Sequence, residues 1–184
     1  MSSEARDPSD RQQGVLALTR ALTQAADLLD AVAADDLGRP TPCTDWDVRA
    51  LANHLLAATR VFVTMMQGVP PGWHREEGDG PYGEEMRTRG NVLINLWREL
   101  PADEAAQDAD WQATEVAVHT WDLATALGRS TAGLDQAVAQ RALVTMDRVL
   151  GPERRGRAFQ NARSAPEGSD AYTHLAAYAG RVVA

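Results

Sequence analysis

The sequence contains no lysine, a single cysteine and no hydrophobic run long enough to span a membrane. All 18 basic residues are arginine, which excludes a Schiff-base mechanism or a lysine general base. Cys43 has no second cysteine with which to form an intrachain disulfide or a multi-cysteine zinc knuckle. No apolar stretch approaches the ~18 residues of a membrane-spanning helix, and the polar, acidic N-terminus lacks the apolar core of a secretory signal. We therefore expect a soluble cytoplasmic protein without membrane association.

Acidic residues outnumber basic ones by 26 to 18, and the formal net charge is −8. Nucleic acids and anionic lipids are bound by basic patches, so we expect neither as a partner. The apolar share of 44% and the charged share of 24% are those of an ordinary globular protein. A length of 184 residues predicts one domain over residues 1–184, with a less regular tail at 152–184 and no second domain.

Apolar residues recur at helical spacing along the chain, and no segment of useful length alternates with the period of a strand. The predicted helices cover about 9–35, 47–68, 84–100, 102–127, 134–150 and 170–179. Thr44 is expected to cap the second helix, and Gly128 to follow the end of the fourth. Residues 68–83 are rich in glycine and proline, which is typical of a crossover, a lid or a binding loop. The sequence predicts an all-α fold: a four-helix bundle with a long crossover loop after the second helix and extra C-terminal helices.

Glu115, His119 and Asp122 are spaced so that they share one face of the fourth predicted helix. A glutamate and a histidine four residues apart lie one turn apart, so that both side chains can reach a single ion. Asp122 falls on the same side, where its carboxylate can accept a hydrogen bond from the imidazole N–H that is not bound to metal, or from a bound water. The same spacing also occurs as an ordinary pair on a helix face, and the spacing alone leaves both interpretations open.

His54 lies in the second predicted helix, flanked by Leu51 and Leu55. It is either a histidine at the edge of the core that one hydrogen bond satisfies, or a ligand that faces the Glu115–His119 pair across the bundle. Three such ligands would leave a metal ion at least one position for water or substrate. Cys43 is the one thiolate that could close the site as a fourth ligand.

Three segments carry recognisable patterns: TPCTDWDVRALANHLL (41–56), EVAVHTWDLATALGR (115–129) and YTHLAAYAGR (172–181). The first is similar to a Thr-Pro-Cys…Trp…His-Leu signature, the second to Glu-x-x-x-His-x-Trp-Asp-Leu-Ala, and the third to a C-terminal Gly-Arg ending. Together they resemble the mycothiol-dependent maleylpyruvate isomerase-like family, within the DinB/YfiT-like metal-binding bundles. The resemblance extends over nearly the whole chain.

The resemblance implies a divalent metal held by His54, Glu115 and His119, most often zinc, with nickel, manganese or iron(II) as alternatives. It also implies a low-molecular-weight thiol such as mycothiol as co-substrate, and a homodimer formed through bundle helices. The family isomerase carries a second, C-terminal domain for which this chain is too short. The stretch before Glu115 also lacks a Pro-Phe-Gly-type segment that is common among relatives. The resemblance therefore does not extend to isomerisation of maleylpyruvate.

These observations favour a metal-dependent enzyme that acts on a small molecule, in the first place a (myco)thiol-dependent S-transferase. In this hypothesis a thiol bound to the metal acts as the nucleophile, and Asp122 is the catalytic residue that orients a ligand or relays a proton. A hydrolase, lyase or cyclase that uses metal-bound water needs the same open site. A non-catalytic metal-binding or small-ligand-binding protein is the third hypothesis.

Several residues outside these patterns have two interpretations. Cys43, just before a helix N-terminus, has either a thiol of lowered pKa or a buried structural role. His74 in the glycine-rich loop either reaches over the site or is exposed to solvent. Three arginines form a solvated cluster or meet an anionic ligand: Arg154, Arg155 and Arg157. Three tryptophans fill the bundle or line a pocket wall: Trp46, Trp111 and Trp121.

Overall fold

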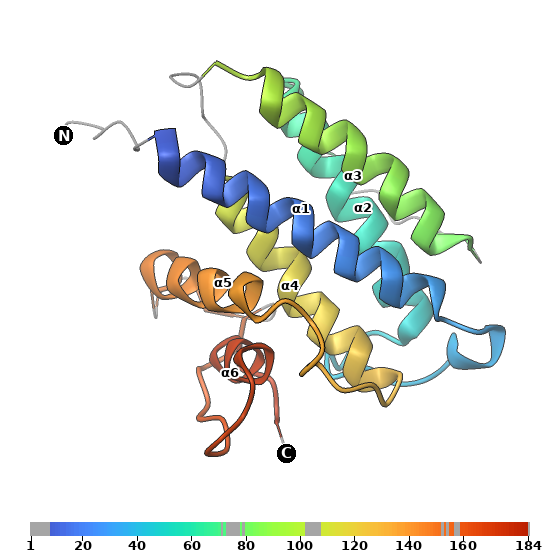
Figure 1. The fold of residues 1–184 in the computed structure, drawn as a ribbon. Helices are drawn as coiled ribbons and strands as arrows, with labels where there is room; N and C mark the ends of the chain where they lie inside the picture. The colour runs from blue at the N-terminus through green and yellow to red at the C-terminus, as the bar shows by residue number, and fades with distance from the viewer. Residues whose placement is uncertain are drawn as a thin grey trace.

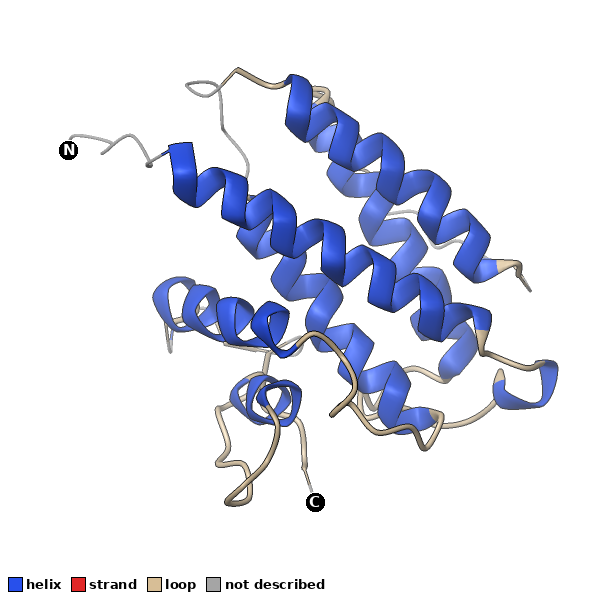
Figure 2. Cartoon of the chain, viewed as in Figure 1, coloured by secondary structure: helices blue, strands red, loops and turns tan. Residues whose placement is uncertain are grey.

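The computed structural model describes residues 8–70, 72, 78, 80–101, 108–151, 153, 155–156 and 159–183. In these ranges the chain forms six α-helices and one 3-10 turn, and contains no strand (Figure 2). The elements are α1 (Pro8–Asp30), the turn η1 (Ala34–Asp36), α2 (Val48–Met66), α3 (Tyr82–Glu99), α4 (Ala109–Ala126), α5 (Gln136–Val149) and α6 (Ala171–Tyr178). The all-α prediction is confirmed.

Helices α1 to α4 form the bundle. Both α1 and α2 pack against α3 and α4, while α5 and α6 pack against each other and against α4 at one side (Figure 1). The colours of Figure 1 show that α2 and α3 run in the same direction. The segment 67–81 therefore connects helix ends that lie at opposite ends of the bundle, which confirms the predicted crossover.

Helix α4 is the centre of the fold. Fifteen of its 18 residues are buried, because α1, α2, α5 and α6 all pack against it. Two of its buried hydroxyls, on Thr114 and Thr120, donate hydrogen bonds to backbone carbonyls one turn earlier in the same helix. By contrast, the side chains of Glu115 and Asp122 face other elements: Glu115 contacts His54 on α2, and Asp122 contacts Arg181 after α6.

The first helix is shorter than the sequence predicts. Helix α1 ends at Asp30 rather than near residue 35, and the backbone at Ala33 is extended. The carboxylate of Asp36 accepts a hydrogen bond from the Ala33 N–H at 3.1 Å, which stabilises η1 as a separate turn. An aspartate that bonds to nearby backbone competes in this way with continued helix.

Aspartates also set the starts of α2 and α4. Asp47, not Thr44, is the N-cap of α2, and its carboxylate accepts a hydrogen bond from Ala50 N at 2.8 Å. Asp108 is extended and caps α4, so that this helix begins seven residues later than predicted, and residues 102–107 lie outside the described part of the chain. The predicted end of α4 is confirmed, because Gly128 has a φ of 66° there.

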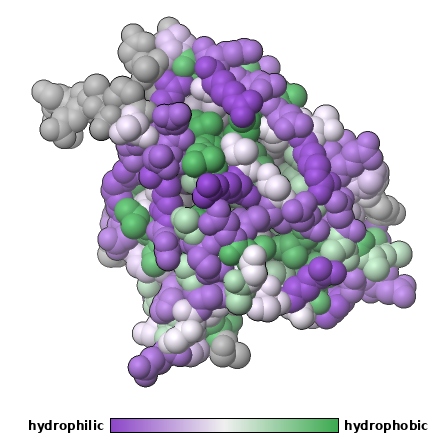
Figure 3. Space-filling model, viewed as in Figure 1, coloured by the Kyte–Doolittle hydropathy of each residue, from purple (hydrophilic) through white to green (hydrophobic). Residues whose placement is uncertain are grey.

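The surface seen in Figure 3 is mainly hydrophilic, with smaller hydrophobic areas. Among the described residues, the exposed large hydrophobic side chains are Leu16, Val69, Val92, Val144 and Val182. None of the described helices combines the length and apolar character needed to cross a membrane. The homodimer stays a prediction.

Candidate metal centre

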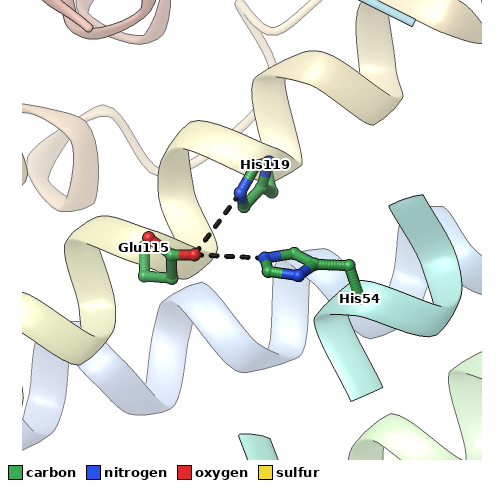
Figure 4. Close-up of side chains that lie close together, drawn as sticks. All are labelled: His54, Glu115 and His119. Atoms are coloured by element: carbon green, nitrogen blue, oxygen red, sulfur yellow. Dashed lines mark hydrogen bonds and ion pairs between the residues drawn. The ribbon is translucent and has the colours of Figure 1, made fainter. Parts of the chain in front are cut away.

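Three side chains from two helices converge on one point between α2 and α4. His54 projects from α2, while Glu115 and His119 project from successive turns of α4 (Figure 4). Glu115 Oε1 lies 3.1 Å from His54 Nε2 and 3.4 Å from His119 Nε2. The three residues that the spacing and the resemblance single out are therefore neighbours in space.

The donor atoms fit a divalent ion. One ligand atom from each of the three residues lies within 4.8 Å of the others, and no other group of three or more such residues occurs in the described part of the chain. In a tetrahedral zinc site with bonds of about 2.0–2.2 Å, donor atoms lie about 3.3–3.6 Å apart. The distances of 3.1 and 3.4 Å are close to this spacing. Two imidazoles and one carboxylate form the His₂Glu ligand set that catalytic zinc sites use.

Solvent reaches part of the site. The side chains of His54 and Glu115 are each 17% exposed, whereas His119 is 7% exposed. His54 and Glu115 are therefore the more exposed of the three side chains, and His119 is the more deeply buried.

Asp122 lies behind His119, on the side away from Glu115. Its Oδ2 is 3.0 Å from His119 Nδ1, and its side chain has no exposed surface. A carboxylate at Nδ1 places the imidazole proton there and leaves the Nε2 lone pair for a metal. The arrangement is therefore a carboxylate–histidine pair of the kind that supports metal ligands.

The electrostatics of Glu115 and His119 depend on each other. Burial opposes ionisation of Glu115, but hydrogen bonds with His119 and His54 outweigh it and hold the carboxyl pKa well below its ordinary value. Burial likewise opposes a charged His119, but hydrogen bonds with Asp122 and Glu115 raise its pKa to about 9. Without an ion, the site thus holds a proton on His119 between two carboxylates.

His54 and Asp122 complete this balance. Burial is the main cause that lowers the pKa of His54, so this imidazole is neutral near pH 7. Burial acts against the charged form of Asp122, but the hydrogen bond with His119 and the Arg181 guanidinium keep its pKa below the ordinary value. The neutral imidazole of His54 is the form that binds a metal. The ionised carboxylate of Asp122 is the form that accepts the hydrogen bond from His119.

Trp46 covers one side of the two histidines. Its ring centroid lies 4.3 Å from that of His54 and 5.5 Å from that of His119. A turn before α2 holds it there: Trp46 N donates to Cys43 O at 2.8 Å, and the Thr41 hydroxyl donates to Trp46 O at 2.9 Å. Of the three tryptophans named above, Trp46 is the one that lies against these imidazoles.

Cys43 does not have the properties of a reactive thiol. Burial is the main cause that raises its pKa to about 11, and nearby carboxylates add to the effect against Arg181. Of the two interpretations of Cys43, the thiol of lowered pKa is therefore excluded, because desolvation exceeds any benefit from the helix N-terminus that follows, and the structural role is the one that remains. Cys43 is also outside the group of clustered donors, so the structure gives the site no fourth protein ligand within the described residues.

Other candidate residues have structural contacts or lie outside the described part of the chain. The guanidinium of Arg155 donates to the carbonyls of Gln160 and Tyr178 at 2.6 and 2.9 Å and stacks on the Tyr178 ring. It therefore holds the C-terminal segment together. His74, Arg154 and Arg157 lie outside the described residues.

Arg181 has no role predicted from the sequence, and the structure places it beside the site. Its guanidinium bonds to both carboxylate oxygens of Asp122, with Nε 3.1 Å from Oδ1 and Nη2 3.0 Å from Oδ2. The Gly-Arg ending is the one sequence signal that points to it. That signal does not name the partner, because residues 122 and 181 meet only through the packing of α6 on α4.

Comparison with known proteins identifies the family. Residues 18–113, just over half of the chain, match the model of the mycothiol maleylpyruvate isomerase N-terminal domain. The chain belongs to this family, and membership implies a mycothiol-related, metal-dependent, enzyme-like function. The matched region contains His54 but ends before Glu115 and His119, so the geometry above is what connects these two residues with His54.

Uncharacterized proteins of Mycobacterium tuberculosis, from strains CDC 1551 / Oshkosh and H37Rv, are similar to nearly the full chain. Each is 29% identical over 197 aligned positions, which include 92% of this chain and 98% of the relative. A comparison with solved structures found no match.

Proposed function

We propose that this protein is a zinc-dependent S-transferase that joins a low-molecular-weight thiol such as mycothiol to an electrophilic small molecule. The observation that carries the proposal is the convergence of His54, Glu115 and His119 within 4.8 Å, at a point that solvent can reach. Family membership supports the thiol, because the matched family is mycothiol-related.

His54 Nε2, Glu115 Oε1 and His119 Nε2 would hold the ion. Zinc bound there would lower the pKa of a coordinating thiol, so that the sulfur is present as a thiolate near neutral pH. The described residues supply three ligands and no fourth, which leaves room for the thiol to bind. Three protein ligands with an open position are typical of catalytic rather than structural zinc sites.

Asp122 acts as a positioning residue in this proposal. Asp122 is wholly buried behind His119 and accepts a hydrogen bond from His119 Nδ1. It therefore does not reach a substrate on the Nε2 side of that ring. Of the two roles considered above, orientation of a ligand therefore fits its geometry and proton relay to substrate does not. Trp46 shields the imidazoles from water on one side.

The overall reaction balances without an added oxidant or reductant. The sulfur forms a bond to an electrophilic carbon of the substrate, and the thiol proton leaves to solvent. The electron pair of the broken bond goes to the leaving group, or, for addition to a double bond, to the neighbouring carbon, which is then protonated. His54, Glu115 and His119 would hold the ion for this reaction. Asp122 would orient His119, and Trp46 would exclude water from one side of the imidazoles.

The test uses protein in which cobalt(II) replaces zinc. Addition of mycothiol is expected to produce the near-ultraviolet charge-transfer band of a cobalt–thiolate bond. The matched control is Cys43→Ala, which removes the one thiol of the chain, so that any band in this variant comes from the added thiol. The loaded protein is then assayed with an electrophilic chloronitrobenzene, with and without mycothiol.

A cobalt–thiolate band in Cys43→Ala together with conjugation that needs both metal and mycothiol supports the proposal. Metal binding without a band, but with turnover of an ester or amide, would contradict it and favour a hydrolase that uses bound water. Metal binding with neither band nor turnover would favour a non-catalytic binding protein.

A further inference from the structure

A buried chain of polar contacts connects the C-terminal segment with the metal centre. Arg181 bonds to both oxygens of Asp122, and Asp122 Oδ2 lies 3.0 Å from His119 Nδ1. The side chains of Arg181 and Asp122 are 6% and 0% exposed. A bidentate guanidinium–carboxylate pair fixes the plane and position of the carboxylate more strictly than one hydrogen bond does.

The backbone after α6 directs Arg181 toward this contact. Gly180 has a φ of 91°, Gly180 N donates to Ala177 O, and Arg181 N donates to Ala176 O, both at 2.9 Å. This pair of bonds is the Schellman ending of a helix, which sets the direction in which the chain leaves. A Cβ on residue 180 would lie 2.7–2.9 Å from atoms of Gln160, so glycine is needed for the close packing as well as for the positive φ.

The pair also lies near the turn that carries Trp46, since the charges of Arg181 and Asp122 both influence the pKa of Cys43 in that turn. The described structure shows no arginine other than Arg181 bonded to Asp122. Without Arg181 the buried carboxylate would keep His119 as its one charged partner, and its position would be less restricted.

We propose that Arg181 is a positioning residue of the metal centre, which acts through Asp122 to hold His119 in its metal-binding orientation. The inference rests on the metal centre proposed above and extends it to a residue that is distant in sequence and is not a ligand. The segment after α6 is then part of the support of the site, and its docking on α4 affects metal affinity.

The experiment measures the zinc dissociation constant by competition with a chromogenic chelator. Loss of a hydrogen-bonding partner behind a metal ligand typically weakens binding about 10- to 100-fold, and we expect this loss for Arg181→Met and for Asp122→Asn. Arg181→Lys keeps the charge but not the bidentate fork, and is expected to restore part of the affinity. The control is Arg155→Met, which removes another arginine that holds the same C-terminal segment but does not touch Asp122.

The double variant Arg181→Met/Asp122→Asn shows whether Arg181 acts through Asp122. It leaves no unpaired buried charge, so it keeps the test valid if Arg181→Met alone does not fold. We expect it to bind zinc about as weakly as Asp122→Asn, since the two changes remove one support. A separate additional loss in the double variant, an equal loss in Arg155→Met, or unchanged affinity in Arg181→Met would overturn the inference. Absence of zinc binding by the wild-type protein would instead overturn the metal centre itself, and this inference with it.

Discussion

At the scale of single residues, one carboxylate oxygen contacts both imidazoles. Glu115 Oε1 lies within 3.4 Å of the Nε2 atoms of His54 and His119. The Nε2 atom of His119 that faces this oxygen can carry either a proton or a metal ion, but not both. Burial opposes the charged form, but hydrogen bonds with Asp122 and Glu115 raise the pKa of His119 to about 9, so that a proton and a metal ion compete for this position.

This competition predicts that zinc affinity increases with pH up to about 9. Below that pH, metal-free His119 carries a proton that zinc must displace, whereas His54 is neutral and Glu115 ionised because their pKa values are lowered. Release of one proton strengthens observed binding about tenfold per pH unit. Chelator competition at pH 7, 8, 9 and 10, corrected for protonation of the chelator, measures this slope. Affinity that does not change between pH 7 and 9 would show that His119 is not the displaced base.

At the scale of elements, a partly buried ion-pair cluster joins three helices away from the proposed metal centre. Arg141 on α5 contacts Asp110 on α4 through two nitrogens and Asp10 on α1 at 2.7 Å. A Cβ on residue 14 would lie 2.9 Å from Asp110 Oδ1, so that Gly14 leaves the space for this carboxylate beside α1. The ion pair therefore fixes α1, α4 and α5 relative to one another.

We predict that Arg141→Met lowers the free energy of unfolding by about 2–4 kcal/mol, because it leaves the buried carboxylate of Asp110 without its main partner. Urea unfolding followed by circular dichroism measures the change. The control is Arg148→Met, also on α5, which removes an exposed ion pair of 3.5 Å with Asp108 and is expected to cost less than about 1 kcal/mol. Equal losses in the two variants would contradict the role assigned to Arg141.

The elements themselves follow from local patterns to different degrees. Helix existence is predictable because apolar spacing is a local property, as in α1, where Leu18, Leu22 and Leu29 are buried as their spacing predicts. The start of α2 is less predictable, because Thr44 and Asp47 both have side chains that can cap a helix. The fold decides between them through the backbone bonds of the turn that precedes Val48.

The same distinction applies to the site. Glu115, His119 and Asp122 share a face through helical spacing alone, so their proximity is predictable from the sequence. The approach of His54 from another helix needs either the resemblance or the structure. Arg181 cannot be assigned from the sequence, because its contact depends on how α6 docks on α4 and on the direction that Gly180 gives the chain.

At the scale of the whole molecule, the proposed metal centre has ligands on α2 and α4, and the Arg181–Asp122 contact links it to the segment after α6. Metal binding is therefore expected to stabilise the complete fold rather than one helix. At a free zinc concentration 100 times the dissociation constant, the gain is about 2.7 kcal/mol. For a protein of this size we predict an increase in Tm of about 5–10 °C.

Differential scanning calorimetry of metal-free and zinc-loaded protein measures this increase, and removal of zinc with a chelator should reverse it. Mycothiol is expected to raise Tm further in the zinc-loaded protein and to have no effect on the metal-free protein. An equal mycothiol effect in both forms would mean that the thiol does not bind at the metal.

The most direct test of the metal centre is the zinc content of the purified chain after loading and removal of unbound metal, measured by elemental mass spectrometry. We predict about one zinc per wild-type chain, the stoichiometry of a mononuclear three-ligand site. His119→Ala should retain essentially none, whereas His174→Ala, which changes an exposed histidine of α6, should bind zinc as the wild type does. Stoichiometric zinc in His119→Ala, or its absence from the wild-type protein, would contradict the metal centre formed by His54, Glu115 and His119.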